Sequence, residues 1–362
     1  MSYLVTPASH EFPVICKLVS ALDHIPSKSI IFLSTCAAVE YFQHVLPLIL
    51  PSIDGQPIVL VPLHGKQPSK VREKNFNRFS NAATPCILLT TDVAARGLDI
   101  PQVDLVLQID PPSDAKVFLH RCGRAGRAGR RGLSVVFLHP GREEAEYPGF
   151  LERRGTPVSL LTNPVVEVST EEAETTARAM RGVVLADRAI HDKAQRAFPS
   201  WVKSYSKHQA SHIFRINELD WEDLAKAWAL LKLPKMPELK GWEGDRSLGL
   251  GIDFSSYGYK DKQRENLRQQ AMRERDSNDA TTSKVGVAAK QGQKRAWSDK
   301  LEQREEREKR RDKKRTKRDW VRWEQMTPSE REEQQKLEGM IEQVKRKRLE
   351  DDQLEEFAGF DD

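Results

Sequence analysis

The stretch that decides the fold runs from Thr90 to Arg130 and opens with TTDVAARGLDI (90–100), an acidic turn that follows an apolar run. After a second apolar run, VFLHRCGRAGRAGR (117–130) repeats arginine at every third position, with glycine and alanine between. Arginines in such a series repel one another on a shared face unless an anion lies opposite, and the glycines weaken an ordinary surface helix. The pattern therefore favours a phosphate-bearing ligand over a solvated basic face.

The acidic turn carries the groups that a nucleotide needs. Hydroxyls and free backbone N–H groups at a strand-to-helix turn suit phosphate oxygens, and a carboxylate suits ribose hydroxyls. The turn offers these groups at Thr91, Asp92, Gly97 and Asp99. A plain capped turn, with Asp92 as the helix cap, is the alternative interpretation of this segment alone.

Short apolar runs alternate with helix-like segments from about residue 9 to 162. This alternation predicts an α/β fold, with a parallel sheet covered by helices on both faces. Ligands of such sheets gather at the carboxyl ends of the strands, where Ser34-Thr35, His64-Gly65 and residues 90–99 fall. The predicted strands are 29–34, 57–62, 86–90, 103–110 and 133–138, and the predicted helices are 36–49, 69–79, 113–122 and 142–154.

The remainder of the chain changes character twice. Residues 171–239 are helix-like with large aromatic anchors, which predicts a small all-helical domain packed on the sheet domain. Beyond them the chain is charged and poor in apolar residues, so we expect a tail that is helical or without fixed structure. Residues 294–318 hold thirteen Lys or Arg against six Asp or Glu, which favours a polyanionic partner. The predicted domains are 1–165, 171–240 and 241–362.

Cysteine usage and hydropathy bound the environment of the protein. The four cysteines form no C-x-x-C pair, which favours reduced thiols in an intracellular protein, and we expect no metal site. No apolar run approaches the length of a membrane span, and the N-terminal residues lack the pattern of a secretory signal. We therefore expect a soluble intracellular protein without a membrane partner.

Four segments together carry a specific resemblance. SIIFLST (29–35), LHGKQPSKVREKNF (63–76), TTDVAARGLDI and HRCGRAGRAGR (120–130) resemble motifs IV, IVa, V and VI of the DEAD-box RNA helicases, in the order of that family. Residues 200–239 are similar to the C-terminal extension of the subfamily that acts in large-ribosomal-subunit assembly. The resemblance implies that residues 1–165 are the second RecA-like domain of a helicase, followed by the helical extension and a basic tail.

The resemblance also implies roles for individual residues. Arg124 and Arg127 match the arginine fingers that act on the γ-phosphate of ATP, and Gly97 and Asp99 match residues that contact the nucleotide. His120 and Arg121 would couple this site to the RNA side and to the partner domain. The residues matched to RNA contacts, aimed at the sugar-phosphate backbone rather than at bases, are Thr35, Gly65, Arg72 and Thr91.

The sequence departs from the family pattern in three respects. Ala125 stands where the family usually has threonine, and Ser69 stands where it often has glutamine. There is no G-x-x-x-x-G-K-[ST] loop and no D-E-A-D cluster, so the Mg²⁺ ligands that accompany ATP belong to a first domain that this sequence lacks. We expect the chain alone to hydrolyse almost no ATP. A truncated gene model is the favoured explanation, and a natural shortened binding protein is the alternative.

These features lead to two main hypotheses about the function of the whole protein. The first is an ATP-dependent RNA helicase that acts in rRNA processing and large-subunit assembly, with RNA (pre-rRNA) and the pre-ribosomal large subunit as partners. We expect it to be monomeric and to reside in the nucleus and nucleolus. The alternative is a non-enzymatic RNA- or pre-ribosome-binding protein that uses the helical extension and the basic tail. A third hypothesis takes the tail, with KRRDKKRTKR (309–318), mainly as a nuclear import signal and a coiled-coil-like partner surface.

Overall fold

The computed structural model describes residues 1–22, 24–53, 55–92, 103–126 and 132–282. Residues 1–276 form one compact unit, and residues 277–362 form a second. The account below concerns the first unit. In the part of the chain that the structure describes, no helix is both long enough and apolar enough to cross a membrane.

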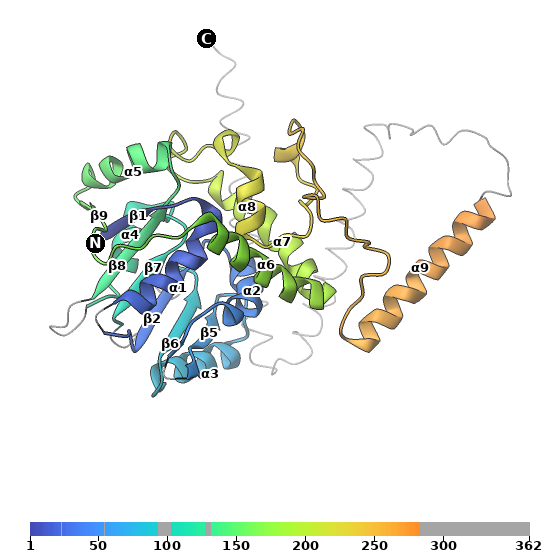
Figure 1. Ribbon diagram of the computed structural model, residues 1–362, viewed down its shortest axis with the longest axis horizontal. Coiled ribbons are helices and arrows are strands. Elements are labelled where there is room, and N and C mark those ends of the chain that lie inside the picture. The colour runs from blue at the N-terminus through green and yellow to red at the C-terminus, as the bar shows by residue number, and fades with distance from the viewer. Residues whose placement is uncertain (23, 54, 93–102, 127–131, 283–362) are drawn as a thin grey trace, which may run out of the picture. The chain divides into compact units, whose positions relative to one another are not determined.

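A parallel sheet forms the centre of the unit. Among the described residues it has seven strands in the order β5-β6-β2-β7-β8-β1-β9, and every neighbouring pair is parallel (Figure 1). The α/β prediction is therefore confirmed, whereas β1, β9 and a small hairpin of β3 and β4 were not predicted. The strands are β1 (Ser2–Val5), β2 (Lys28–Phe32), β3 (Ser52–Ile53), β4 (Gln56–Pro57), β5 (Val59–Leu63), β6 (Cys86–Thr90), β7 (Leu105–Gln108), β8 (Leu133–Leu138) and β9 (Ser159–Leu160).

The helices begin and end for local reasons that the sequence carries. Thr35 caps α2, because its side chain accepts a hydrogen bond from the Ala38 amide at 3.1 Å. Ser169 and Glu172 form a capping box at the start of α6. The α-helices are α1 (Glu11–Ala21), α2 (Cys36–Val45), α3 (Ser69–Ser80), α4 (Ala115–Cys122), α5 (Arg142–Glu152), α6 (Thr170–Ala186), α7 (Arg188–Tyr205), α8 (Trp221–Ala227) and α9 (Lys262–Thr282).

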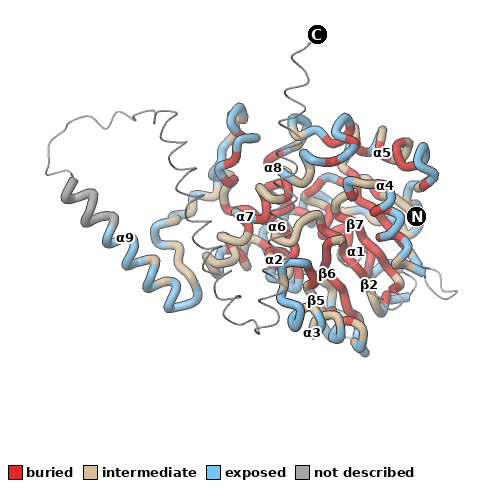
Figure 2. The backbone as a smooth tube through the Cα atoms, turned by 180° about the vertical axis from the view of Figure 1, so that it is seen from behind, coloured by how far each residue is buried: buried red, intermediate tan, exposed pale blue. Residues whose placement is uncertain are grey.

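The alternation of side chains along the strands divides the core between the two faces of the sheet. Ile31, Leu89 and Leu107 belong to a cluster with α1 and α2. Ile30, Leu88 and Val106, one position away on the same strands, belong to a second cluster with Phe79 of α3. Figure 2 shows the strands as the most continuously buried part of the chain. Such two-sided burial explains why these strands are apolar at successive positions instead of alternating with polar residues.

The helical extension shares this core. Residues of α6, α7 and α8 pack into the cluster that covers α1 and α2. Ala210, Ile213 and Phe214, which follow α7, pack instead with Phe118 and Tyr147 on the opposite face. The extension therefore contacts both faces of the sheet, and helices α6–α8 confirm the predicted helical character. The domain boundaries at about residues 165 and 240 remain predictions.

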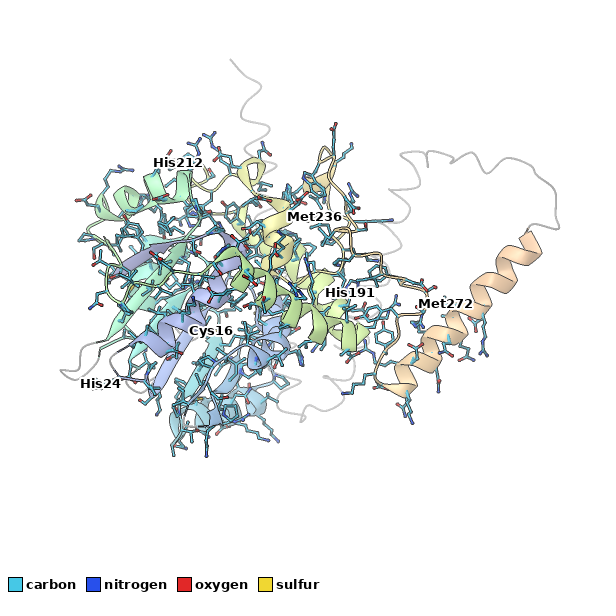
Figure 3. The ribbon with its side chains drawn as sticks, viewed as in Figure 1. Cys16, His24, His191, His212, Met236 and Met272 are labelled. Atoms are coloured by element: carbon cyan, nitrogen blue, oxygen red, sulfur yellow. The ribbon has the colours of Figure 1, made fainter. Side chains whose placement is uncertain are left out.

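The glycine- and serine-rich segment after the extension is irregular but packed. His191 of α7, labelled in Figure 3, lies against the rings of Phe254 and Tyr257 at centroid distances of 5.2 and 5.8 Å. The Tyr257 hydroxyl donates to the carbonyl of Val184, and the Lys232 ammonium lies 3.8 Å from the Phe254 ring centroid. Aromatic and cation–π contacts thus hold a segment that has no regular secondary structure of its own.

A buried hydroxyl joins the sheet domain to the extension, and its removal provides a test of this packing. Tyr41 of α2 donates to the carbonyl of Trp228 at 2.6 Å, and both residues are buried. We expect Tyr41→Phe to lower the free energy of unfolding by about 1–3 kcal/mol, because a buried carbonyl loses its donor. Tyr147→Phe is the matched control, since the buried Tyr147 hydroxyl has no hydrogen-bond partner. Urea denaturation that gave equal values for the two variants would contradict this account.

Candidate functional site

Three adjacent strands bring the predicted RNA-contacting residues to one edge of the sheet. Strands β5, β6 and β2 are neighbours and parallel, so their carboxyl ends lie together. Gly65 follows β5, Thr91 follows β6 and Thr35 follows β2. The predicted convergence at the carboxyl ends therefore holds for these three positions.

The side chains at this edge differ in what they can offer to a ligand. Thr35 already accepts the helix-capping bond, which leaves its hydroxyl hydrogen to be donated to an anion. Gly65 is exposed, whereas Thr91 is only 7% exposed. Arg72, in the first turn of α3, is half-buried, and its Nη2 donates to Ser69 Oγ at 3.2 Å. Ser69, the departure from the family's glutamine, thus contacts the arginine that is predicted to bind RNA.

Arg121 is the most deeply buried charge near this edge, with only 1% of its surface exposed. Its Nη2 lies 2.7 Å from Asp92 Oδ1, its Nε donates to the same oxygen at 2.8 Å, and its Nη1 donates to the Asp110 carbonyl at 2.8 Å. The guanidinium also lies 5.0 Å from the ring centroid of Phe32. A buried cation requires such compensation. Asp92 is therefore paired with Arg121. The residues that the capping interpretation of this turn concerns, after Asp92, lie outside the described residues.

The arginine-rich turn lies elsewhere on the sheet. Helix α4 ends at Cys122, and the Gly126 amide donates to the carbonyl of Val103, which precedes β7. Arg124 is half-buried and lies toward the amino end of β7, whereas Arg121 reaches the carboxyl ends. The expectation that the arginines share one face is wrong for this pair, because the helix stops between them. His120, next to Arg121 on α4, is exposed.

The other residues predicted to bind the nucleotide cannot be placed. Gly97, Asp99 and Arg127 lie outside the described residues. Within the described ranges there is no group of three His, Cys, Asp or Glu side chains arranged to hold a metal ion. All four cysteines are free thiols.

The extension covers the part of the carboxyl edge that belongs to β7 and β8. Trp201 Nε1 donates to Asp110 Oδ1 at 2.6 Å, and the Tyr205 hydroxyl donates to Glu143 Oε1 at 2.6 Å. Burial lowers the pKa of His208 to about 4, so the ring is neutral; its Nδ1 accepts from the Ala210 amide and its Nε2 donates to the Pro112 carbonyl. These contacts enclose a cavity of about 60 Å³ whose lining includes Ser34, Asp92, Asp110, Arg121, His139 and Trp201.

A buried acid–base cluster lies beside this cavity. His139 Nδ1 lies 3.2 Å from Glu143 Oε1, and its Nε2 lies 3.4 Å from Glu11 Oε1. Glu143 and Glu11 hold the pKa of His139 well above its usual value against the opposing effect of burial, while burial raises the pKa of Glu11 to about 7. Sequence reasoning missed this cluster and the Asp110–Trp201 contact. Their partners are far apart along the chain, and only the acid at position 143 and the histidine at 139 share a local segment.

Comparison with known proteins now identifies the parts of the chain. Residues 11–129 match the helicase conserved C-terminal domain. Residues 187–236 and 259–362 match, respectively, the C-terminal extension and the C-terminal tail of SPB4-like ATP-dependent rRNA helicases. The chain belongs to this family.

The chain is similar to curated relatives and to solved structures in different degrees. An ATP-dependent rRNA helicase spb4 from Sclerotinia sclerotiorum is 56% identical over 100% of this chain and 58% of that protein. Its namesake from Aspergillus oryzae is 53% identical, with the same two coverages. The chain thus spans less than two thirds of the length of these relatives. Domain 2 of the DEAD-box helicase Mss116p bound to an RNA duplex is 23% identical and covers 65% of this chain and 88% of its own, with a TM-score of 0.45.

The family matches separate the two halves of the carboxyl edge. The helicase domain match includes the strand ends that carry Thr35, Gly65 and Thr91, and it extends through Arg124. The extension match includes α7 and α8, and therefore Trp201 and the other side chains that cover β7 and β8. In this chain the matched extension thus forms part of the wall beside the strand ends that carry Thr35, Gly65 and Thr91.

The buried cluster makes stability depend on pH in a direction that can be tested. Glu11 has a folded pKa of about 7, above its ordinary value, so the folded state keeps a proton that the unfolded chain releases, and stability falls as the pH rises through that interval. We expect Glu11→Gln to gain about 2 kcal/mol relative to the natural sequence between pH 5.5 and pH 8. The measurement is urea denaturation at both pH values, with the exposed Glu222→Gln as control. Parallel pH profiles for Glu11→Gln and the natural sequence would contradict the assignment.

The arginine turn depends on a close backbone approach. A Cβ atom at Gly132 would lie 2.2 Å from the Gly126 nitrogen and 2.8 Å from the Ala125 carbonyl carbon. We expect Gly132→Ala to lower the free energy of unfolding by about 1–3 kcal/mol, because the backbone of the turn must move. Gly182→Ala in α6 is the control, since a Cβ there meets nothing within 4 Å and alanine favours a helix. Equal stabilities of the two variants in thermal unfolding would show that the turn is not closely packed.

Proposed function

We propose that this chain supplies the second RecA-like domain and the extension of an ATP-dependent RNA helicase that acts in rRNA processing and large-ribosomal-subunit assembly. The observation that carries the proposal is the family match of all three segments, combined with the gathering of Thr35, Gly65 and Thr91 on adjacent strand ends. No observation favours the alternative of a non-enzymatic RNA-binding protein.

RNA is held in this proposal by its backbone. The Thr35 hydroxyl, the exposed Gly65 backbone and the Arg72 guanidinium are donors suited to phosphate oxygens. Thr91 is more buried, so it supports the edge and contributes through its backbone. Donors of this kind recognise the shape and charge of a strand and carry little sequence information. The substrate class is therefore single-stranded or locally opened RNA, with pre-rRNA in the pre-ribosomal large subunit as the natural target.

ATP is the second substrate. Arg124 and Arg127 act as the arginine fingers on the γ-phosphate, and Gly97 and Asp99 contact the nucleotide. The phosphate loop and the acids that hold Mg²⁺ come from a first RecA-like domain. A finger contributes roughly 10³–10⁵-fold to the rate by stabilising charge in the transition state. The chain alone is therefore expected to hydrolyse little ATP.

The two substrates are coupled through one rigid sheet. The RNA residues lie at the carboxyl ends of β2, β5 and β6, whereas Arg124 lies toward the amino end of β7. Arg121, between them, joins the turn after β6 to the loop after β7, and the exposed His120 faces the first domain. Closure of the two domains over ATP and RNA bends the strand, and hydrolysis reopens the cleft. The protein acts as a monomer in the nucleus and nucleolus.

Substitution of the finger tests the catalytic part of this proposal. In the full-length protein, with its first domain present, we expect Arg124→Ala to reduce RNA-stimulated ATP turnover by roughly 10³–10⁵-fold, since transition-state charge loses its partner. The exposed Arg153→Ala is the control and should keep full turnover. Single-stranded RNA binding should persist in both variants. A folded Arg124→Ala protein with unchanged turnover would sink the finger assignment.

A further inference from the structure

The position of the buried Arg121 side chain depends on residues outside the strand ends that carry Thr35, Gly65 and Thr91. Its guanidinium is buried, and the two shortest of its contacts go to the Asp92 carboxylate and the Asp110 carbonyl. A longer hydrogen bond of 3.4 Å goes from Nη1 to Gln108 Oε1, and the Phe32 ring lies against the guanidinium. The Asp92 side chain is 44% exposed, so it can move. The Asp110 carbonyl belongs to the backbone and is followed directly by Pro111 and Pro112. The groups that orient residue 110 therefore contribute to the position of Arg121.

Two bonds hold the side chain of Asp110. The Ser34 amide donates to Asp110 Oδ2 at 2.9 Å, which ties residue 110 to the end of β2 beside Thr35. Trp201 Nε1 donates to Asp110 Oδ1 at 2.6 Å. Both oxygens of the Asp110 side chain thus accept hydrogen bonds, one from the backbone after β2 and one from the extension. Hydrogen bonds to an ionised acceptor are shorter and stronger than bonds between neutral groups, so this pair of bonds resists rotation of the carboxylate.

Trp201 is itself fixed by its surroundings. It is 3% exposed, and its ring packs against Phe198, Tyr205 and Trp228 at centroid distances of 5.9, 5.4 and 5.8 Å. All four aromatic residues belong to the extension. The indole N–H is therefore presented to Asp110 by a rigid aromatic cluster.

We propose that Trp201 of the helical extension is a positioning residue that sets Arg121, acting through Asp110. The extension then helps to fix Arg121, which lies between the strand ends assigned to RNA and the arginine-rich turn after α4. It does so in addition to contributing to the core. This inference deepens the proposed helicase function and rests on it for its effect on catalysis, but the positioning itself is a property of the chain alone.

The first experiment measures positioning without any activity. In this 362-residue chain labelled with ¹⁵N-arginine, the Arg121 Nε–H, which donates to Asp92, gives a signal protected from exchange with water. Trp201→Phe keeps an aromatic ring and removes the N–H donor. We expect it to speed that exchange by at least about tenfold, because the loss of one hydrogen bond to a charged group changes an equilibrium by about that factor. Trp221→Phe is the matched control, because its ring packs against Phe198 in the same cluster. Unchanged Arg121 exchange in a folded Trp201→Phe chain would overturn the proposal.

The second experiment asks whether positioning matters for turnover. In the full-length protein, we expect Trp201→Phe to lower RNA-stimulated kcat by roughly 10- to 100-fold with KM for ATP nearly unchanged, since a misplacement of about 1 Å far from the reacting atoms can cost up to about 10²-fold. Trp221→Phe should retain kcat. If the natural full-length protein shows no ATPase activity while Arg121 exchange responds to Trp201→Phe, the proposed function fails and the positioning role stands. If activity is present but kcat is unchanged in Trp201→Phe, the role of Trp201 in the reaction is refuted.

Discussion

The burial of one arginine constrains most of the architecture around the candidate site. A guanidinium cannot lose its charge, so Arg121 is tolerable in the interior only with anionic or carbonyl partners on several sides. Asp92 after β6 and the carbonyl of Asp110 after β7 supply them, and the Phe32 ring of β2 lies against the guanidinium. Three strand ends and α4 are therefore held in one arrangement.

The carboxyl edge of the sheet has two parts with different surroundings. The ends of β2, β5 and β6 carry the residues assigned to RNA, while the ends of β7 and β8 are covered by side chains of the extension. The extension also shares the core that covers α1 and α2. It is thus part of the folded domain instead of a separate binding module, which favours the helicase proposal over a chain that merely tethers RNA.

Sequence patterns predicted the parts of the fold that depend on local signals. The apolar run at 86–90 and the helix after Pro68 match β6 and α3 closely, because burial on both faces and a turn at the helix start leave clear local patterns. Strand β1 was missed, since SYLV is short and has no flanking turn signal. The shared face expected for Arg121 and Arg124 failed because α4 ends at Cys122. The Trp201–Asp110 bond joins residues 91 positions apart and has no signature in either segment.

The most direct test of the central claim is a structure of the full-length protein with a non-hydrolysable ATP analogue and single-stranded RNA. The account predicts the Arg124 guanidinium within hydrogen-bond distance of the γ-phosphate, Thr35 and Gly65 on RNA phosphates, and Arg121 still paired with Asp92. A closed complex in which Arg124 contacts only its own domain, or in which RNA avoids the ends of β2 and β5, would contradict it.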